Sequence, residues 1–366
     1  MVTRRQFLQR AAALTTVSWP VAGCAPDGED VYATAVENTW RHAAGVVAQG
    51  APVMRELVRY ATLAPSSHNT QCWRFRLGAK SISILPDFAR RCPAVDPDDH
   101  HLFVSLGCAS ENLIQASLAM GLHGEASFET ARDAVHIALS PTGANATPLF
   151  KAIPDRQSTR GEYDARPLSM EELALLERAA TSDRVRVLLL TECSAIEKVL
   201  EYVVQGNTAQ MNDPAFVAEL KTWIRFNGTD AVRTGDGLFS ASSGNPTVPA
   251  WLGRRMFDLF FSPKSENDKY AKHLRSSAGV AVFVGQAADQ PHWVEVGRAY
   301  ERFALQATAL GIRTAFVNQP VEVASLRSQF ASCVGAGTMR PDLVVRFGRG
   351  PTLPRSLRRP VQAVLV

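Results

Sequence analysis

The stretch GCASENLIQASLAMG at residues 107–121 returns in altered form 190 positions later, as GRAYERFALQATALG at residues 297–311. In both copies apolar residues recur at steps of three and four, which predicts two long helices. Each copy ends in a glycine, where a helix C-cap favours positive φ. Small residues along both copies would let two such helices approach closely, although two Ala-rich helices could also match by coincidence. The aligned copies share Gly107 with Gly297, Ala109 with Ala299, Glu111 with Glu301, Ala119 with Ala309 and Gly121 with Gly311.

The rest of the chain alternates strand and helix patterns. Short runs rich in Val, Ile or Leu predict strands at residues 80–86, 135–139, 184–190, 278–284 and 343–347. Ser169 and Glu172 form a capping-box pattern that predicts the start of a helix. We therefore expect an α+β fold built as a tandem repeat, with a first half at residues 30–145 and a second half at residues 146–366.

Residues 206–277 differ from the remainder of the second half. This stretch is polar and rich in Gly and Pro, yet it carries Trp223, Phe226, Phe239, Trp251 and Phe257. Long insertions with scattered aromatic residues are typical of lids and binding loops. A disordered linker is the weaker interpretation, because linkers seldom hold so many large apolar side chains. We predict an inserted lid.

The formal charge is +4 over 366 residues, and Arg4, Arg5 and Arg10 supply three of those charges. Without them the chain is near +1, so net charge gives no support to nucleic-acid binding. The five cysteines beyond residue 24 form neither a CxxC pair nor a zinc pattern, and we expect packed thiols and no metal site. The acidic and histidine run at residues 96–101 follows this expectation, since charged residues around a proline usually form a turn. These cysteines are Cys72, Cys92, Cys108, Cys193 and Cys333.

The first 24 residues have the pattern of an export signal. Arg4 and Arg5 before Gln6-Phe7-Leu8 resemble a twin-arginine signal, and the apolar run at residues 11–19 is too short to span a bilayer. Residues 21–24, VAGC, resemble a lipoprotein processing box, which would make Cys24 the acylated residue. Ordinary cleavage, an uncleaved anchor and an amphipathic N-terminal helix are the alternatives. We expect the twin-arginine translocase as a partner and a periplasmic or cell-envelope location, with a lipid anchor to the membrane.

Three polar segments could carry chemistry. The first is APSSHNTQCWRF at residues 64–75, the second is DRQSTR at residues 155–160, and the third is LPRSLRR at residues 353–359. Arginine clusters with hydroxyl groups suit a phosphate dianion, although each cluster alone could be a solvated surface. The chain has no GxGxxG after a strand, no P-loop, no GxSxG and no HExxH. Taken singly, each cluster is more often a solvated surface than a phosphate site.

Together these segments resemble the nitroreductase superfamily. Residues 65–71 are similar to its flavin-lining segment, residues 156–160 to its opening Arg-x-Ser segment, and residues 353–358 to its phosphate-binding tail. Residues 297–319 are similar to its helix and flavin-facing turn. The matches cover roughly residues 55–125 and 150–359, and the lid has no counterpart in ordinary members. The resemblance implies FMN as cofactor and NAD(P)H or another electron donor, with nitro compounds, quinones or similar small molecules as acceptors.

The resemblance also assigns residues. The phosphate would be held by Arg156, Ser158, Arg355 and Arg358, and Arg160 would lie beside the flavin pyrimidine edge. The other half would contribute Pro65, Ser66, Ser67, Asn69 and Gln71, and Asn318 and Gln319 would lie near N5. No separate catalytic acid or base is implied. Cys72 replaces the usual proline and would put a thiol near the flavin, and Arg359 leaves open which second arginine reaches the phosphate.

The order of these segments implies one complete flavin site in a fused chain, with the second site lost. This is similar to a fused-repeat branch with a lid, some of whose members store FMN. The leading hypothesis is an FMN-dependent oxidoreductase. The alternatives are a flavin-sequestering protein with little turnover and an envelope protein without flavin.

Overall fold

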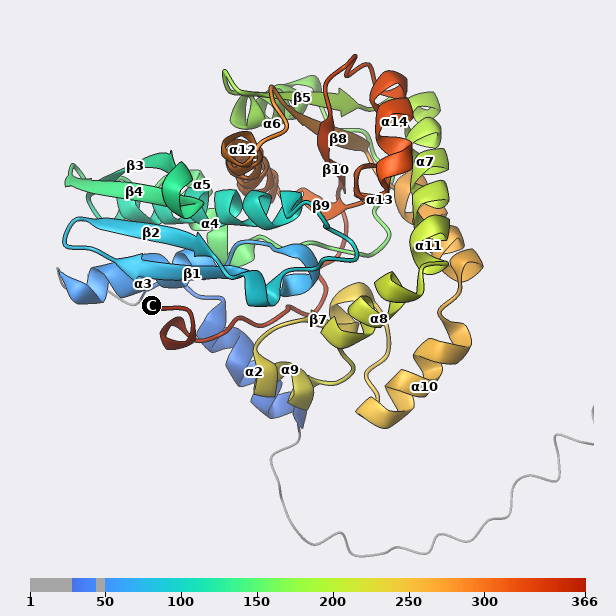
Figure 1. Ribbon diagram of the computed structural model, residues 1–366, viewed down its shortest axis with the longest axis horizontal. Helices are drawn as coiled ribbons and strands as arrows, with labels where there is room; N and C mark the ends of the chain where they lie inside the picture. The colour runs from blue at the N-terminus through green and yellow to red at the C-terminus, as the bar shows by residue number, and fades with distance from the viewer. Residues whose placement is uncertain (1–27, 44–49) are drawn as a thin grey trace, which may run out of the picture.

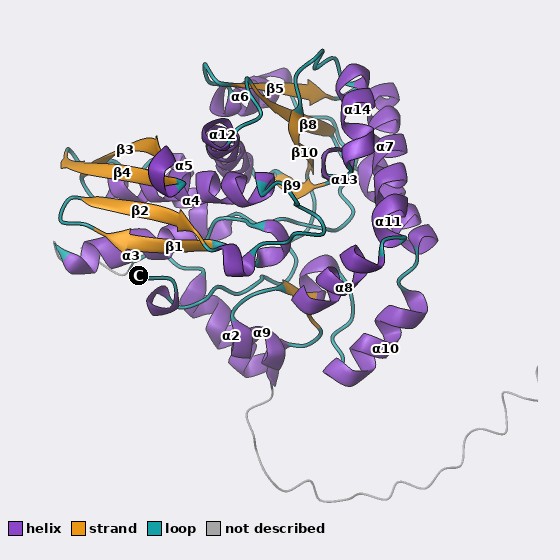
Figure 2. Ribbon diagram, in the orientation of Figure 1, coloured by secondary structure: helices purple, strands orange, loops and turns teal. Residues whose placement is uncertain are grey.

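Two four-stranded antiparallel sheets with the same strand order form the framework of the protein (Figure 2). The computed structural model describes residues 28–43 and 50–366, so the expected export signal and Cys24 lie outside the described residues. The first sheet has the order β1-β2-β4-β3, from β1 (Trp73–Leu77), β2 (Ser81–Pro86), β3 (Leu122–Glu129) and β4 (Ala134–Pro141). The second has the order β5-β8-β10-β9, from β5 (Val185–Leu190), β8 (Gly279–Gly285), β9 (Arg313–Phe316) and β10 (Pro341–Gly348). The repeated order confirms the predicted α+β tandem architecture.

The two repeat helices occupy equivalent places in this order. α4 (His100–Ala119) joins the second strand to the third in the first sheet, and α12 (Gln290–Ala309) does so in the second. They cross at their glycines: a Cβ on Gly107 would lie 2.0 Å from the Val294 carbonyl oxygen, and one on Gly297 would lie 2.0 Å from that of Val104. Only glycine permits so close an approach of two backbones. The predicted helix pair is thus the joint between the halves (Figure 1).

The core forms on both sides of this joint. β8 and β10 are buried along their whole length, as expected for strands covered on both faces. Phe283, Tyr300 and Phe303 pack edge to face between β8 and α12. Each fully buried aromatic or branched side chain contributes about 1.5–3 kcal/mol. The five predicted strands all form, with no end shifted by more than two residues.

Shorter helices complete the two halves. α6 (Met170–Ala180) begins with the predicted capping box, in which Ser169 and Glu172 satisfy each other's backbone N–H. No helix in the described part of the chain is long and apolar enough to cross a bilayer. The others are α2 (Gly28–Thr39), α3 (Ala51–Thr62), α5 (Pro148–Ala152), α13 (Gln319–Glu322) and α14 (Arg327–Cys333).

A large insertion between β5 and β8 takes the place of the tight hairpin that joins β1 to β2. It contains α7 (Cys193–Met211), α8 (Pro214–Trp223), β6 (Ile224–Arg225), α9 (Gly228–Thr234), β7 (Leu238–Phe239), α10 (Ala250–Phe260) and α11 (Pro263–Arg275). We call residues 193–275 the lid. The expected boundary at residue 206 falls inside α7, because the apolar face of this helix packs on the second sheet and hides the change in composition.

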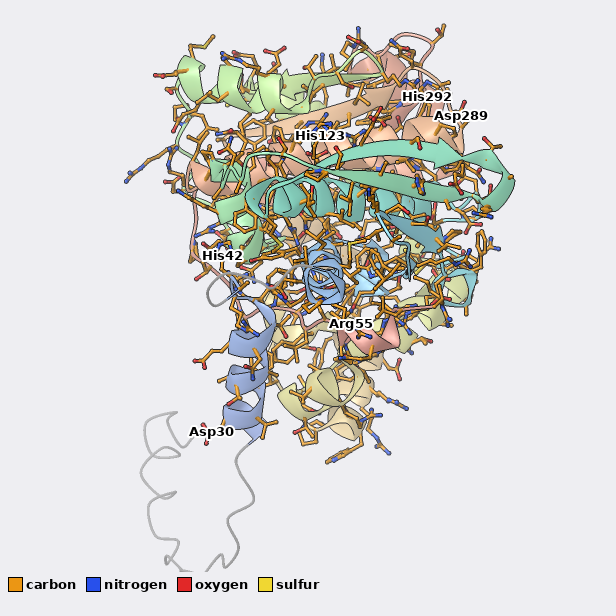
Figure 3. All side chains as sticks on the ribbon, turned by 90° about the vertical axis from the view of Figure 1, so that its left-hand side faces the viewer. Asp30, His42, Arg55, His123, Asp289 and His292 are labelled. Carbon is orange, nitrogen blue, oxygen red and sulfur yellow. The ribbon has the colours of Figure 1, made fainter. Side chains whose placement is uncertain are left out.

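The C-terminal tail, residues 349–366, returns to the first half. Phe75 N donates to Val364 O (2.8 Å), and Val366 N donates to Phe75 O (3.0 Å), so the tail pairs with the edge of β1. Helix α2 holds the tail from outside, since Tyr32 Oη donates to Arg355 O (2.6 Å). Figure 3 shows Asp30 at the exposed tip of α2, far from Asp289 and His292 at the start of α12. The tail therefore brings second-half arginines to the first half.

The cysteines among the described residues after Cys24 are all free thiols. Cys72, Cys92 and Cys108 are buried, as expected for packed thiols. Cys193 is exposed, so the expectation is wrong at this position. It opens α7 at the start of the lid, where the first helical turn faces solvent.

Candidate functional site

A deep cleft lies between the second sheet, α4, the turn at residues 65–68 and the lid. The second half contributes residues 315–319, at the end of β9 and just beyond it, and Leu343 and Arg346 of β10. The lid contributes residues of five of its elements, among them Phe216, Phe239 and Tyr270. Residues from three parts of the chain therefore enclose one space.

A smaller hollow, the arginine pocket, adjoins this cleft. The two share Pro65, Ser66, Arg160 and Leu238 as lining residues, so they are continuous. The complete lining of the arginine pocket is Trp40, Pro65, Ser66, Asn69, Arg156, Gln157, Ser158, Arg160, Leu238, Ser242, Arg355, Ser356 and Arg358.

All the site residues predicted from the sequence, except Gln71, line one or both hollows. Asn69 and Arg156, which come from different halves, meet in the arginine pocket. Gln71 is fully buried instead. Its Nε2 donates to Gly235 O of the lid (2.8 Å), and its Oε1 accepts from Arg359 N of the tail (2.9 Å). Gln71 therefore joins lid and tail.

The turn at residues 65–71 holds an unusual backbone. His68, Asn69 and Gln71 have φ of 48°, 52° and 55°, in the left-handed region that non-glycine residues seldom adopt. Ser66 Oγ accepts from Gln71 N (2.9 Å) and closes the turn. The Asn69 amide donates to Gly237 O (3.0 Å) and Leu357 O (3.1 Å), so its donors are committed to the protein and not to the pocket. Within this turn, Ser66 and Ser67 are the hydroxyl residues that line the hollows.

Arg358 is tied to the end of α3. Its guanidinium donates to Thr62 O (2.7 Å), Leu63 O (3.1 Å) and Ala64 O (3.1 Å), which are carbonyls that the helix end leaves without partners. Burial, and secondarily the nearby Arg156, lower the pKa of Arg358 to about 9. Arg358 is thus a cation whose donors are bonded to protein, and it contributes a positive electrostatic potential to the arginine pocket.

Arg156 is only partly bonded. It is 2% exposed, its Nη2 donates to Leu63 O (3.0 Å), and its Nε lies 3.2 Å from Oε1 of Glu301. Its Nη1 is buried and has no hydrogen-bond partner among the described residues. Burial raises the pKa of Glu301 to about 7, against the opposing effect of Arg156. The Arg156–Glu301 pair therefore leaves Nη1 of Arg156 without an acceptor beside the arginine pocket.

Arg160 lines both hollows and, within the described chain, its side chain makes no hydrogen bond or ion pair with protein. Arg160 is half-buried, and burial lowers its pKa, as expected for a cation with reduced access to water. Burying an unpaired charge is costly unless a ligand compensates it. This position has the electrostatics of an anion site.

Arg355 and Ser158 lie on the opposite side of the arginine pocket. The Arg355 guanidinium bonds Pro154 O and lies 3.4 Å from Asp155 Oδ1, with its plane 4.9 Å from the Trp40 ring. Ser158 forms a parallel bridge with Thr314, which fixes its segment against β9. At the cleft, the backbone N–H groups of Asn318 and Gln319 donate no hydrogen bond within the described residues. They are free donors where β9 meets α13.

Comparison with known proteins identifies the fold. No protein-family model matches the chain. "Putative NAD(P)H nitroreductase Rv3131" of Mycobacterium tuberculosis is 27% identical over 329 residues, covering 86% of this chain and 91% of the relative. The structure of "a putative nitroreductase" from Anabaena variabilis covers 86% of this chain and 91% of its own, with a TM-score of 0.51 at 10% identity. The chain has the nitroreductase fold. The FMN-dependent nitroreductase NfnB from Mycobacterium smegmatis, in complex with NADPH, covers 59% of this chain and 96% of its own, with a TM-score of 0.39 at 14% identity.

Within this nitroreductase fold, several residues of the site were not predicted from the sequence, and two of them contact the predicted arginines or the backbone beside them. Trp40 lies between Arg355 and Arg358, whose guanidinium groups are 4.9 and 4.7 Å from its ring. No local pattern marks it, because α2 reaches the tail only through tertiary packing. Arg346 donates to Thr159 O (3.1 Å) and Gly161 O (2.6 Å) and so holds the backbone on both sides of Arg160. A lone arginine inside the apolar run LVVRFG was the signal that could have revealed it.

Two expectations for the neighbourhood need comment. Cys72, expected to place a thiol near the flavin, lies in the apolar core and outside the cleft lining, and burial raises its pKa to about 11. Its side chain points to the core because β1 begins at the next residue. The run at residues 96–101 forms a turn that caps α4, since Asp96 accepts from His101 N (3.0 Å) and Leu102 N (3.0 Å).

Proposed function

We propose that this chain binds one FMN in the cleft, with the phosphate in the arginine pocket, and works as a nitroreductase-type oxidoreductase. The observation that carries the proposal is Arg160, a cation at the junction of the two hollows that has no partner within residues 28–43 and 50–366. The unpaired Nη1 of Arg156 points to the same need for an anion. Arginine guanidinium groups, serine hydroxyls and free backbone N–H groups are the donors that a phosphorylated isoalloxazine requires.

The residues divide into two groups. Arg156, Ser158 and Arg355 would hold the phosphate, while Arg358 and Asn69 keep these groups in position through their own bonds. Arg160 would offset negative charge on the flavin ring, and the N–H groups of Asn318 and Gln319 would donate to its edge. Bound FMN supplies two-electron transfer from NAD(P)H or another donor to a nitro compound, quinone or similar acceptor. The lid side chains exclude water from this space.

A single flavin per chain follows from the repeat. Moving 190 residues along the chain takes His101, Val104 and Ser105 of the cleft to Pro291, Val294 and Glu295, which line a second hollow between the sheets. The described lining of that hollow offers Arg184 and two acidic residues, with no counterpart of the arginine pocket. The absence of this cluster supports one site and not two.

The test is NAD(P)H oxidation by flavin-loaded protein with a panel of nitro and quinone acceptors. We expect turnover, and Arg346→Lys should reduce it by loosening the backbone around Arg160. A protein that binds FMN but shows no turnover with any donor and acceptor would contradict the enzyme assignment.

A flavin-sequestering protein is the second candidate, and the attachments of the lid favour it. Asp236 of the lid forms an ion pair with Arg90, and Gly237 N donates to Asn69 O (3.1 Å). A lid bonded in this way to the first half would restrict access to the cleft. Dithionite-reduced protein distinguishes the two: rapid oxidation by a small nitro compound supports the enzyme, and slow oxidation supports storage.

We also propose export by the twin-arginine route and acylation of Cys24, from the pattern of residues 1–24. Changing Arg4 and Arg5 together to Lys should retain the protein in the cytoplasm, as cell fractionation would measure. Unchanged fractionation would reject this route.

A further inference from the structure

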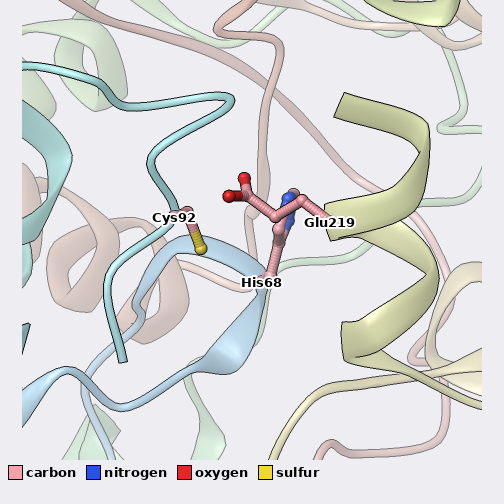
Figure 4. A group of neighbouring side chains, drawn as sticks. All are labelled: His68, Cys92 and Glu219. Carbon is pink, nitrogen blue, oxygen red and sulfur yellow. The ribbon is translucent and has the colours of Figure 1, made fainter. Parts of the chain in front are cut away.

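Three side chains from distant parts of the chain meet where the lid touches the first half. His68 lies in the turn η1 (Ser67–Asn69), Cys92 follows the turn η2 (Phe88–Arg90), and Glu219 belongs to lid helix α8. One donor atom of each lies within 4.8 Å of the others (Figure 4). None of them belongs to the arginine pocket, although His68 also lines the cleft.

We propose that His68, Cys92 and Glu219 bind a divalent zinc ion that fastens the lid to the first half. An imidazole nitrogen, a thiolate sulfur and a carboxylate oxygen are the three donor types that Zn²⁺ takes in proteins. Three protein ligands with an open fourth position is a common zinc arrangement. The mixed set favours zinc over Mg²⁺ or Ca²⁺, which require oxygen ligands.

The geometry is close to that of a bound site. Bonds of about 2.0–2.3 Å at tetrahedral angles place ligand atoms roughly 3.5 Å apart. The present separation of up to 4.8 Å is therefore about 1 Å larger than in a bound site. Glu219 is held in place because its two oxygens accept from Ala94 N (2.9 Å) and Val95 N (3.2 Å), in the same loop as Cys92. Such outer bonds orient the ligands of metal sites.

The imidazole gives a second, independent indication. His68 Nε2 is buried and has no hydrogen-bond partner in the described chain, and its residue is held at φ 48°. A buried orphan nitrogen in a strained turn is costly unless something binds it. Zinc would replace the thiol proton of Cys92, which is released to solvent.

The consequence is a metal clamp on the lid. A zinc ion here would join α8 to the turn at residues 65–68, which lines the cleft, and would add to the Arg90–Asp236 ion pair. Metal binding can be measured without flavin, so this inference stands or fails separately from the proposed function.

The experiment uses the full chain, stripped with a chelator and titrated with Zn²⁺ against a chromophoric chelator. We expect one tight zinc per chain, and at least about a tenfold loss of affinity in Cys92→Ser and Glu219→Gln, since even outer-shell changes cost 10–100-fold. Matched controls are Cys333→Ser and Glu201→Gln, which remove a thiol and a carboxylate outside the cluster and should bind as the unmodified chain does.

Cobalt provides a readout that the unmodified chain gives by itself, without any variant. The difference spectrum of Co²⁺-loaded minus metal-free protein should contain a thiolate-to-cobalt charge-transfer band, which Cys92→Ser removes and Cys333→Ser retains. Absence of the band in the unmodified chain, or zinc affinity equal in Cys92→Ser and the controls, overturns the proposal.

Discussion

Replacing Arg160 by Gln should have opposite effects on the flavin-free and the flavin-bound protein. Without ligand, this half-buried guanidinium has no protein partner among the described residues. A neutral amide reduces the cost of its partial desolvation, so the free energy of unfolding of flavin-free Arg160→Gln should rise by about 1 kcal/mol. With FMN, the loss of a charge-assisted hydrogen bond of about 1.5–3 kcal/mol should raise the Kd by roughly 10–150-fold.

Arg358→Gln is the matched control, because it changes the same residue type in the same pocket. Arg358 donates to three carbonyls at the end of α3, so its loss should lower the unfolding free energy by about 2–4 kcal/mol with or without FMN. Urea unfolding of the flavin-free proteins and titration of FMN fluorescence measure both quantities. The reasoning is refuted if Arg160→Gln destabilises the flavin-free protein as Arg358→Gln does, or if its FMN affinity is unchanged.

Three further predictions follow from the joint, the repeat and the buried histidine. Gly107→Ala puts a Cβ 2.0 Å from a backbone oxygen and should lower the free energy of unfolding by about 3 kcal/mol, measured by heat or urea. The control Gly143→Ala, whose Cβ has no atom within 4 Å, should change it little. Equal effects of the two variants would contradict the close helix crossing. Equilibrium binding should saturate at one FMN per chain, and two would show that the second hollow also binds. Burial lowers the pKa of His68 from 6.5 to about 4, so the unfolded chain takes up this proton first as pH falls, and stability is lost. Between about pH 7.5 and about pH 5.5 this effect lowers the free energy of unfolding by about 1 kcal/mol. In chelator-treated samples, His68→Asn, in which asparagine tolerates the positive φ, should lose about that much less stability than the unmodified chain over the same range. Parallel stability profiles of the two proteins against pH would reject the assignment.

Much of the fold was predictable because its signals are local. The repeat at Gly107 and Gly297, the terminal glycines and the capping box at Ser169 all act within a few helical turns, and the structure contains each of them. The start of the lid was not predictable, since α7 continues the apolar periodicity of the second half before the composition changes. A helix that packs on the core resembles a core helix in sequence.

The site shows the same division. The resemblance to the nitroreductase superfamily grouped the arginines with the Ser-rich turn, and their residue types agree with it, because a phosphate needs forked donors. Only the tertiary structure decided which arginine is free and which is bonded: Arg358 meets the carbonyls of α3, Asn69 meets the lid and Arg160 meets no partner among the described residues. Likewise, His68, Cys92 and Glu219 carry no shared spacing and become neighbours only when the lid folds over the turn. The sequence by itself determined which donors, acceptors and charges the site contains. The tertiary structure determined which of them remain free to bind a ligand, because hydrogen bonding and burial depend on positions in space.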